Sequence, residues 1–136
     1  MEADVKDNED DVYKTQFNTA VQRIGKVFSY TFWRTQVCGD IFWSVQGYDE
    51  QGSTWIMTQY FGPSEQAYRY QQIVILTHPV ETKIKMVYYS TCQDGRNHIQ
   101  ISKTIMQHFK NDDNSFSFDF KLMRLKRKPK KVMYNI

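Results

Sequence analysis

The sequence predicts an all-β domain, an antiparallel β-sandwich with one short helix. Apolar and aromatic residues alternate with polar residues along most of the chain, and clusters of Gly, Pro, Asn and Asp separate the alternating segments. The composition agrees with this pattern, because nine Phe, nine Tyr and three Trp occur among 136 residues and aromatic side chains favour pleated, half-buried surfaces. A chain of this length is expected to form one domain, and it needs no metal or disulfide to fold.

The first half of the chain contains four expected strands, at residues 10–17, 26–37, 40–48 and 53–61. Residues 18–25 fit either a loop or a helical turn. Residues 38–40 form a tight connection, and residues 49–52 form a hairpin turn in which Gly52 can adopt a positive φ. Aromatic side chains on both faces of residues 26–37 indicate a strand in the middle of a sandwich.

The second half begins with a break at residues 62–66, where Ser64 is expected to cap one helical turn. Residues 68–77 and 82–91 are expected to pair as a hairpin around His78, and residues 93–98 are expected to form a polar loop. The spacing of apolar residues over 101–109 predicts a short helix, which either Ser102 or Thr104 could cap. A last strand at 115–124 places Phe116, Phe118 and Phe120 on one face.

Charge is concentrated at the two ends of the chain. Residues 1–10 are expected to be an acidic disordered arm, residues 11–124 the folded domain, and residues 125–136 a basic tail. The basic cluster consists of Arg124, Lys126, Arg127, Lys128, Lys130 and Lys131. Three interpretations of this cluster stay open: a solvated tail, a nuclear-import signal, or a contact with the phosphate backbone of nucleic acid.

No catalytic or metal-binding pattern is evident in the sequence. Cys38 and Cys92 do not fit a zinc motif or a disulfide framework, and His78, His98 and His108 have no neighbours at ligand spacing. We therefore expect no enzymatic activity, no cofactor and no metal. We also expect an intracellular protein, nuclear or cytoplasmic, because no apolar run is long enough to span a bilayer and the first residues are acidic rather than signal-like.

Three segments resemble the substrate-binding domain of the Seven in absentia (Siah) proteins, which has a TRAF-like β-sandwich fold. Residues 60–70, with the sequence Tyr-Phe-Gly-Pro-Ser-Glu-Gln-Ala-Tyr-Arg-Tyr, resemble the family's strand, glycine turn and Gln-Ala dipeptide. Residues 101–109 followed by 111–120 resemble its late helix, Asn-containing turn and last strand. Residues 40–50 followed by 54–59 resemble its central hairpin. The chain has no RING or zinc-finger cysteines.

The resemblance implies a homodimeric domain that binds a short extended peptide of a partner protein in the ubiquitin pathway. It places the peptide-binding strand at Tyr30, Thr31, Phe32, Trp33 and Arg34. The family's Asp-Trp-x-Met sequence on this strand is not kept. Alternation divides the five residues into two sets, and the alignment predicts that Thr31 and Trp33 face the ligand.

Two functions follow from these observations. The first is a non-enzymatic interaction module, an adaptor or scaffold that adds an extended peptide beside a sheet edge. The alternative is a nuclear, nucleic-acid-associated protein that uses the basic tail. No membrane association is expected.

Overall fold

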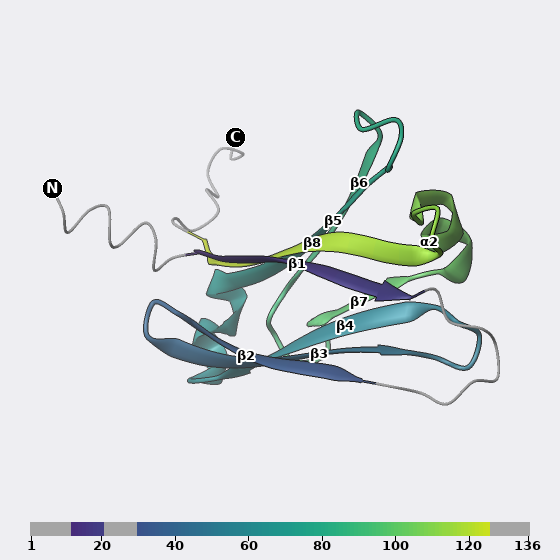
Figure 1. Ribbon diagram of the computed structural model, residues 1–136. Coiled ribbons are helices and arrows are strands. Elements are labelled where there is room, and N and C mark those ends of the chain that lie inside the picture. Colours follow the sequence, from purple (N-terminus) through teal and green to yellow (C-terminus); the bar gives the residue numbers. More distant parts are fainter. Residues whose placement is uncertain (1–11, 21–29, 126–136) are drawn as a thin grey trace, which may run out of the picture.

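Two four-stranded antiparallel sheets face each other in the computed structural model, which describes residues 12–20 and 30–125 (Figure 1). The strand order is β1-β8-β5-β6 in one sheet and β2-β3-β4-β7 in the other. The elements in chain order are β1 (Val12–Ala20), β2 (Thr31–Val37), β3 (Asp40–Tyr48), β4 (Thr54–Phe61), the 3-10 helix η1 (Ser64–Arg69), β5 (Tyr70–Thr77), β6 (Lys85–Thr91), β7 (His98–Ile101), α2 (Lys103–Phe109) and β8 (Ser115–Arg124). The predicted all-β sandwich is therefore confirmed.

Most expected strands occur at or near their predicted bounds, and β3 and β8 agree at both ends. The prediction missed β7, because residues 93–98 were expected to form a loop and 101–109 a helix. This strand has only four residues, and its pairing with β4 between Thr54 and Met57 defines it. The prediction also ended the first strand at residue 17, whereas β1 continues to Ala20 alongside β8. Residues 10, 11 and 21–29 lie outside the described part.

Two tight turns fix the register of the β2-β3-β4 sheet. Cys38 and Gly39 have φ angles of 54° and 82°, as a two-residue turn of type I′ requires. Between β3 and β4, Gly52 has a φ of 88°, and the Asp49 carboxylate accepts hydrogen bonds from the amides of Gln51 and Ser53 at 2.9 and 3.0 Å. Both turns were predicted from the sequence.

The core lies between the sheets, where alternate residues of each strand point inward. The largest contribution comes from β8, whose Phe116, Phe118, Phe120 and Leu122 are all buried, as the period of two predicted. At one end of the core, the rings of Phe42, Tyr60 and Tyr70 pack together with centroids 4.8–5.3 Å apart. These strands therefore bury large aromatic area on their inner faces.

A hydrogen-bonded polar network crosses the core. The Thr58 hydroxyl donates to Gln72 Oε1 at 2.7 Å, and Ser44 Oγ lies 2.8 Å from Thr58 Oγ1. Gln72 Nε2 donates to Ser90 Oγ and to the Asn97 carbonyl, both at 2.9 Å. The network links β3 and β4 of one sheet to β5 and β6 of the other, and its buried polar groups are hydrogen-bonded to one another.

Among the described residues, two helical segments connect the sheets. In α2, the Ser102 hydroxyl accepts a hydrogen bond from the Ile105 amide at 3.2 Å, so one of the two expected caps is confirmed, and Met106 and Phe109 face the core. The expected cap of the earlier turn is wrong. η1 has Pro63 at its N-cap and no capping side chain, because Ser64 is already the first helical residue.

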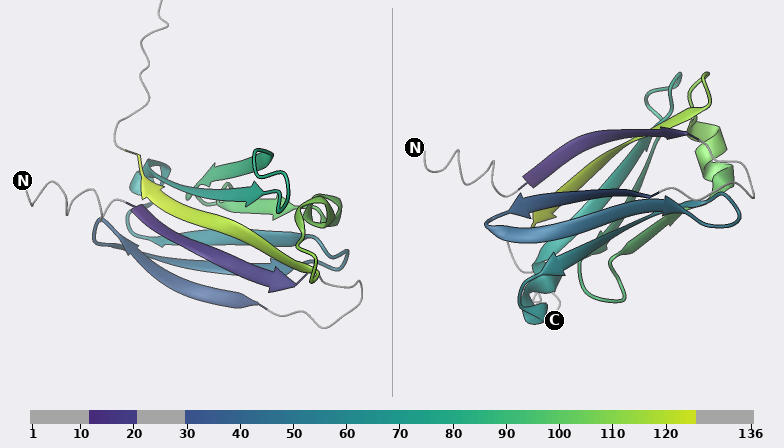
Figure 2. Two further views of the ribbon diagram at one scale, coloured as in Figure 1. Left: turned by 45° about the horizontal axis from the view of Figure 1, so that its top comes forward. Right: turned by 60° about the horizontal axis from the view of Figure 1, so that its bottom comes forward.

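The two ends of the described chain lie side by side. Val12 of β1 pairs with Met123 of β8, so the first described strand begins where the last one finishes (Figure 2). The acidic arm and the basic tail from Lys126 onward lie outside the described residues. Within the part that the structure describes, no helix is long and apolar enough to cross a membrane.

Candidate functional site

The strand that carries the predicted peptide-binding residues, β2, is an edge of its sheet. It pairs with β3 on one side and with no other described strand. Its predicted position in the middle of the sandwich is therefore wrong, because one of its two aromatic faces is exposed rather than packed. A sheet edge presents unpaired backbone groups that can accept another strand, and proteins usually protect such edges with charge, bulges or covering loops. The position of β2 is therefore compatible with strand addition, the binding mode expected from the sequence.

The two faces of β2 differ sharply. Tyr30, just before the strand, and Phe32 expose 52% and 64% of their surface, and Arg34 is also exposed. Trp33 instead packs against the core, with its ring 5.3 Å from that of Phe120 in an edge-to-face contact. The outer face of β2 is therefore that of Phe32 and Arg34.

This arrangement corrects one expectation about the site. Thr31 and Trp33 were predicted to face the ligand, but the Trp33 ring points between the sheets towards β8. Thr31 shares that side of the strand and is itself exposed. The physical reason is that side chains alternate between the two faces of a strand, so only one face can pack in the core. In β2 that inner face carries Trp33, Thr35 and Val37.

The turn and the ladder together show which backbone groups of β2 face the free edge. The turn at Cys38 and Gly39 joins its first residue to its fourth by a hydrogen bond, so Val37 and Asp40 form a hydrogen-bonded pair. Along an antiparallel ladder, hydrogen-bonded pairs alternate with pairs that are not hydrogen-bonded. The amide of Thr58 donates to the Asn97 carbonyl at 3.2 Å, so it points away from Ser44, its partner on β3. By both observations, Phe32 and Arg34 are in pairs with β3 that are not hydrogen-bonded. Their N–H and C=O groups therefore point away from β3, towards the free edge.

Aromatic rings continue from β2 across the neighbouring strands. Tyr30 lies over Gly47, where a Cβ atom would come within 2.7 Å of the Tyr30 ring and 2.8 Å of the Trp55 ring. The centroids of Tyr30 and Trp55 are 5.9 Å apart, and His98 stacks on Trp55 at 6.2 Å. Gly47 thus allows two rings to close over the backbone of β3.

Most other residues of this sheet face are also apolar, although Gln59 lies beside Trp43. Trp43 and Phe61 expose 46% and 56% of their surface, and Ile41, Val45 and Met57 are half-buried. We call this set, together with Tyr30, Phe32 and Trp55, the aromatic face. Large exposed apolar patches of this kind mark interaction sites.

Most of the aromatic face was not predicted from the sequence. The resemblance identifies β2, but no exposed site was predicted at Trp43 or Trp55. Both strands have apolar residues on both faces, so periodicity alone cannot tell which face is solvated. The available signal was the alternation along β3, where the large residues Ile41, Trp43 and Val45 lie on the other face from Phe42 and Ser44.

Burial raises the pKa values of several side chains in the described part of the chain. The Tyr70 hydroxyl donates a hydrogen bond to Asp40 Oδ2, and Tyr60 lies 3.4 Å from the same oxygen. Burial and then this carboxylate raise the pKa of Tyr70, and the same two causes raise the pKa of Tyr60. Burial raises the pKa of the Cys92 thiol to about 12. Among the described residues, no group of three His, Cys, Asp or Glu side chains could hold a metal ion.

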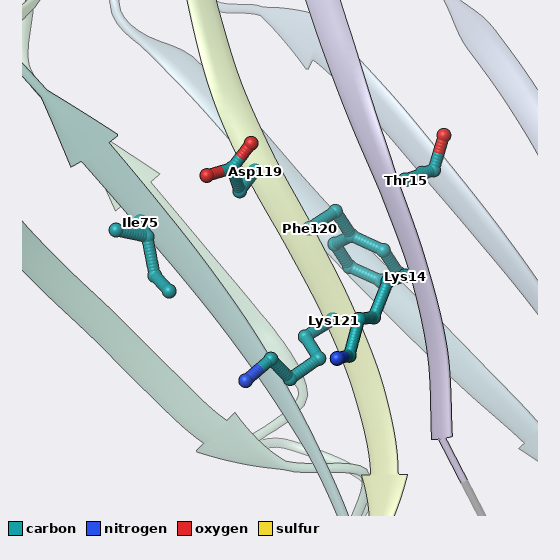
Figure 3. A pocket seen from close by; sticks show the side chains of 6 residues that line it. All are labelled: Lys14, Thr15, Ile75, Asp119, Phe120 and Lys121. Atoms are coloured by element: carbon teal, nitrogen blue, oxygen red, sulfur yellow. The ribbon is translucent and has the colours of Figure 1, made fainter. Parts of the chain in front are cut away.

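A second surface lies on the outer side of the other sheet. Lys14 of β1 and Lys121 of β8 are direct cross-strand partners, and together with Asp119 and Ile75 they border a shallow pocket of about 350 Å³ (Figure 3). Like charges directly opposite each other are destabilising, and Asp119 supplies a carboxylate at the same pocket. Arg124 ends the same strand, and the other predicted tail residues, Lys126, Arg127, Lys128, Lys130 and Lys131, lie outside the described residues.

A scan of the chain against models of protein families found no match, and a search of curated proteins found no relative.

Proposed function

We propose that this protein is a non-enzymatic interaction module that binds an extended segment of a partner protein along the free edge of β2. The single observation that supports this most strongly is the pairing of an open sheet edge with exposed apolar side chains, Phe32 and Tyr30, on the same strand. Main-chain hydrogen bonds to the edge would supply affinity, and the aromatic face would supply selectivity. The module would act as an adaptor or scaffold, as the Siah-like resemblance implies.

The decisive variant is Gln36→Pro, with Gln36→Ala as its matched control. Gln36 is exposed and lies two residues beyond Arg34, so by the same alternation its N–H points to the free edge. Proline there removes one outward donor and blocks strand addition, whereas alanine keeps the donor. We expect partners purified from native cells on the wild-type chain to persist with Gln36→Ala and to be lost with Gln36→Pro. Equal recovery on both variants would contradict edge docking.

We also propose that the domain forms a homodimer. The second sheet ends in β6, another edge strand, on which Val87 and Tyr89 expose 53% and 67% of their surface. A free edge with exposed apolar residues favours self-pairing. Sedimentation equilibrium at tens of micromolar should give twice the chain mass of 16.3 kDa, and Tyr89→Arg should lower it to the monomer value. A wild-type chain that sediments as a monomer would contradict this.

A second candidate function is nuclear nucleic-acid binding through the basic tail, and the opposed pair Lys14 and Lys121 favours it. Phosphate contacts release counterions, so affinity for a DNA or RNA duplex should fall steeply as salt rises. Removing residues 126–136 should reduce that affinity and flatten the salt dependence, while edge docking at β2 should be unaffected. Binding that ignores both salt and the tail would exclude this candidate.

A further inference from the structure

We infer that the docked segment carries an acidic residue opposite Arg34 and, two positions further along, an aromatic or β-branched residue opposite Phe32. This inference rests on the proposed docking along β2 and specifies the chemistry of the partner. In an antiparallel partner strand the pattern reads Asp or Glu, any residue, then Phe, Tyr, Trp, Val or Ile.

The backbone geometry fixes which partner residues matter. The N–H and C=O groups of Phe32 and Arg34 are among the outward groups of β2, and an added antiparallel strand would bond to them. Residues in such hydrogen-bonded pairs lie directly opposite each other, with Cα atoms about 5.5 Å apart. Their side chains point to the same face of the sheet. The partner residues opposite Phe32 and Arg34 therefore join the aromatic face.

The charge on Arg34 selects the first partner residue. Arg34 is exposed on the outer face, and its cross-strand neighbour on β3 is Trp43, followed by Gln59 on β4. Both neighbours are neutral, so β3 and β4 supply no carboxylate in this row. Gln59 itself donates a hydrogen bond to Asp94 at 3.3 Å, and this carboxylate lies on the far side of β4 from Arg34. A carboxylate on the added strand would be the direct neighbour of Arg34 on its open side.

The exposed ring of Phe32 selects the second partner residue. Phe32 pairs with Val45 on β3, and Val45 pairs with Met57 on β4. The Tyr30 ring flanks it at 6.3 Å. Despite these neighbours, 64% of the surface of Phe32 remains exposed. An aromatic or β-branched side chain opposite it would extend the apolar row and cover that surface.

The test is a display library of twelve-residue peptides with randomised central positions, selected on the wild-type chain and on two charge variants. Arg34→Glu reverses the proposed partner charge. Arg96→Glu, at an exposed position in the loop before β7, is the matched control. We expect the wild type and Arg96→Glu to enrich Asp or Glu two positions before an aromatic or β-branched residue. Arg34→Glu should enrich Lys or Arg at the acidic position instead.

The strength of the preference can be measured with the enriched peptides. Exchanging Glu for Lys in a selected peptide should weaken its binding to the wild-type chain roughly tenfold and strengthen its binding to Arg34→Glu by a similar factor. Identical peptide sequences from the wild type and Arg34→Glu would overturn the inferred acidic partner.

Amide exchange separates this inference from the proposed function. Bound peptide should slow exchange at the amides of Phe32 and Arg34. If those amides are protected but no charge pattern is enriched, edge docking stands and the inferred partner chemistry is wrong. If the selected peptides leave both amides unprotected, or if the library yields no binder, docking along β2 fails and the inference fails with it.

Discussion

The Thr58 hydroxyl on β4 donates a 2.7 Å hydrogen bond to Gln72 Oε1 on β5 and so joins the two sheets through the core. A hydroxyl has one proton to donate, so Ser44 must be the donor in its 2.8 Å contact with Thr58. Gln72 uses its remaining donors on Ser90 and Asn97. This chain of bonds satisfies polar groups that are otherwise costly to bury.

Replacing Gln72 by Ala should therefore destabilise the domain strongly. The change removes three hydrogen bonds, leaves buried groups without partners and opens a cavity, for an expected loss of about 2–3 kcal/mol in unfolding free energy. Gln71→Ala, one position along on the outer face, is the control and should change stability by less than about 0.5 kcal/mol. Urea unfolding measures both, and equal midpoints would show that the network contributes nothing.

The neighbours Trp33 and Phe32 should behave in opposite ways when each is changed to Ala. Trp33→Ala removes the ring that packs on Phe120 and should cost about 3 kcal/mol of stability. Phe32→Ala removes an exposed ring and should leave the melting temperature nearly unchanged. If Phe32 belongs to the docking site, its loss should weaken peptide binding by about 1–2 kcal/mol. A stable Trp33→Ala domain would place Trp33 outside the core.

Substitution of Gly47 by Ala should push Tyr30 off the sheet. The new methyl group would meet the rings of Tyr30 and Trp55 at less than 3 Å, and Tyr30 can move because it lies at an exposed edge. We expect a loss of about 1 kcal/mol in the wild-type background and a smaller loss in a Tyr30→Ala background. A double-mutant cycle measures this coupling, and purely additive losses would show that the two residues do not interact.

The Cys92 thiol should resist alkylation in the folded protein. Its pKa of about 12 and its burial keep it protonated and inaccessible at pH 8.5, where an exposed thiol reacts readily. In a Cys38→Ser variant, iodoacetamide should modify the chain only after denaturation. Rapid modification under native conditions would show that Cys92 opens to solvent.

The same shift predicts how stability depends on alkaline pH. The folded-state pKa of Cys92 lies above the unfolded value of about 8.5, so the unfolded chain releases this proton first. The contribution to stability is complete below about pH 8.5 and falls as pH rises towards 12. Tyr60 and Tyr70, whose pKa values are also raised, should steepen this fall. Cys92→Ala should lose less stability over this range than the wild type.

The sequence predicted the strands well where one face is uniformly aromatic. In β8, Phe116, Phe118 and Phe120 recur at every second position, and this pattern identifies both the strand and its buried face. It predicted β7 poorly, because four residues carry little periodicity and their strand state depends on pairing with β4. Local sequence holds no information about that distant partner.

The candidate site was harder to predict for a related reason. Alternation along β2 separates Trp33 from Phe32 but does not say which side faces the other sheet, and the answer depends on where Phe120 lies. The buried polar residues pose the same difficulty, since Gln72 and Thr58 look like surface positions in the sequence. Their burial follows from hydrogen bonds made across strands that are far apart in the chain.

The pairing of Val12 with Met123 also bears on the order in which the domain assembles. β2, β3 and β4 are joined by tight turns and need only local loop closure. Among the described strands, β1 pairs only with β8, and that contact closes a loop on the order of a hundred residues. Long-range pairing of this kind slows folding. During synthesis, β1 must wait until nearly the whole domain has left the ribosome before β8, its partner strand, exists.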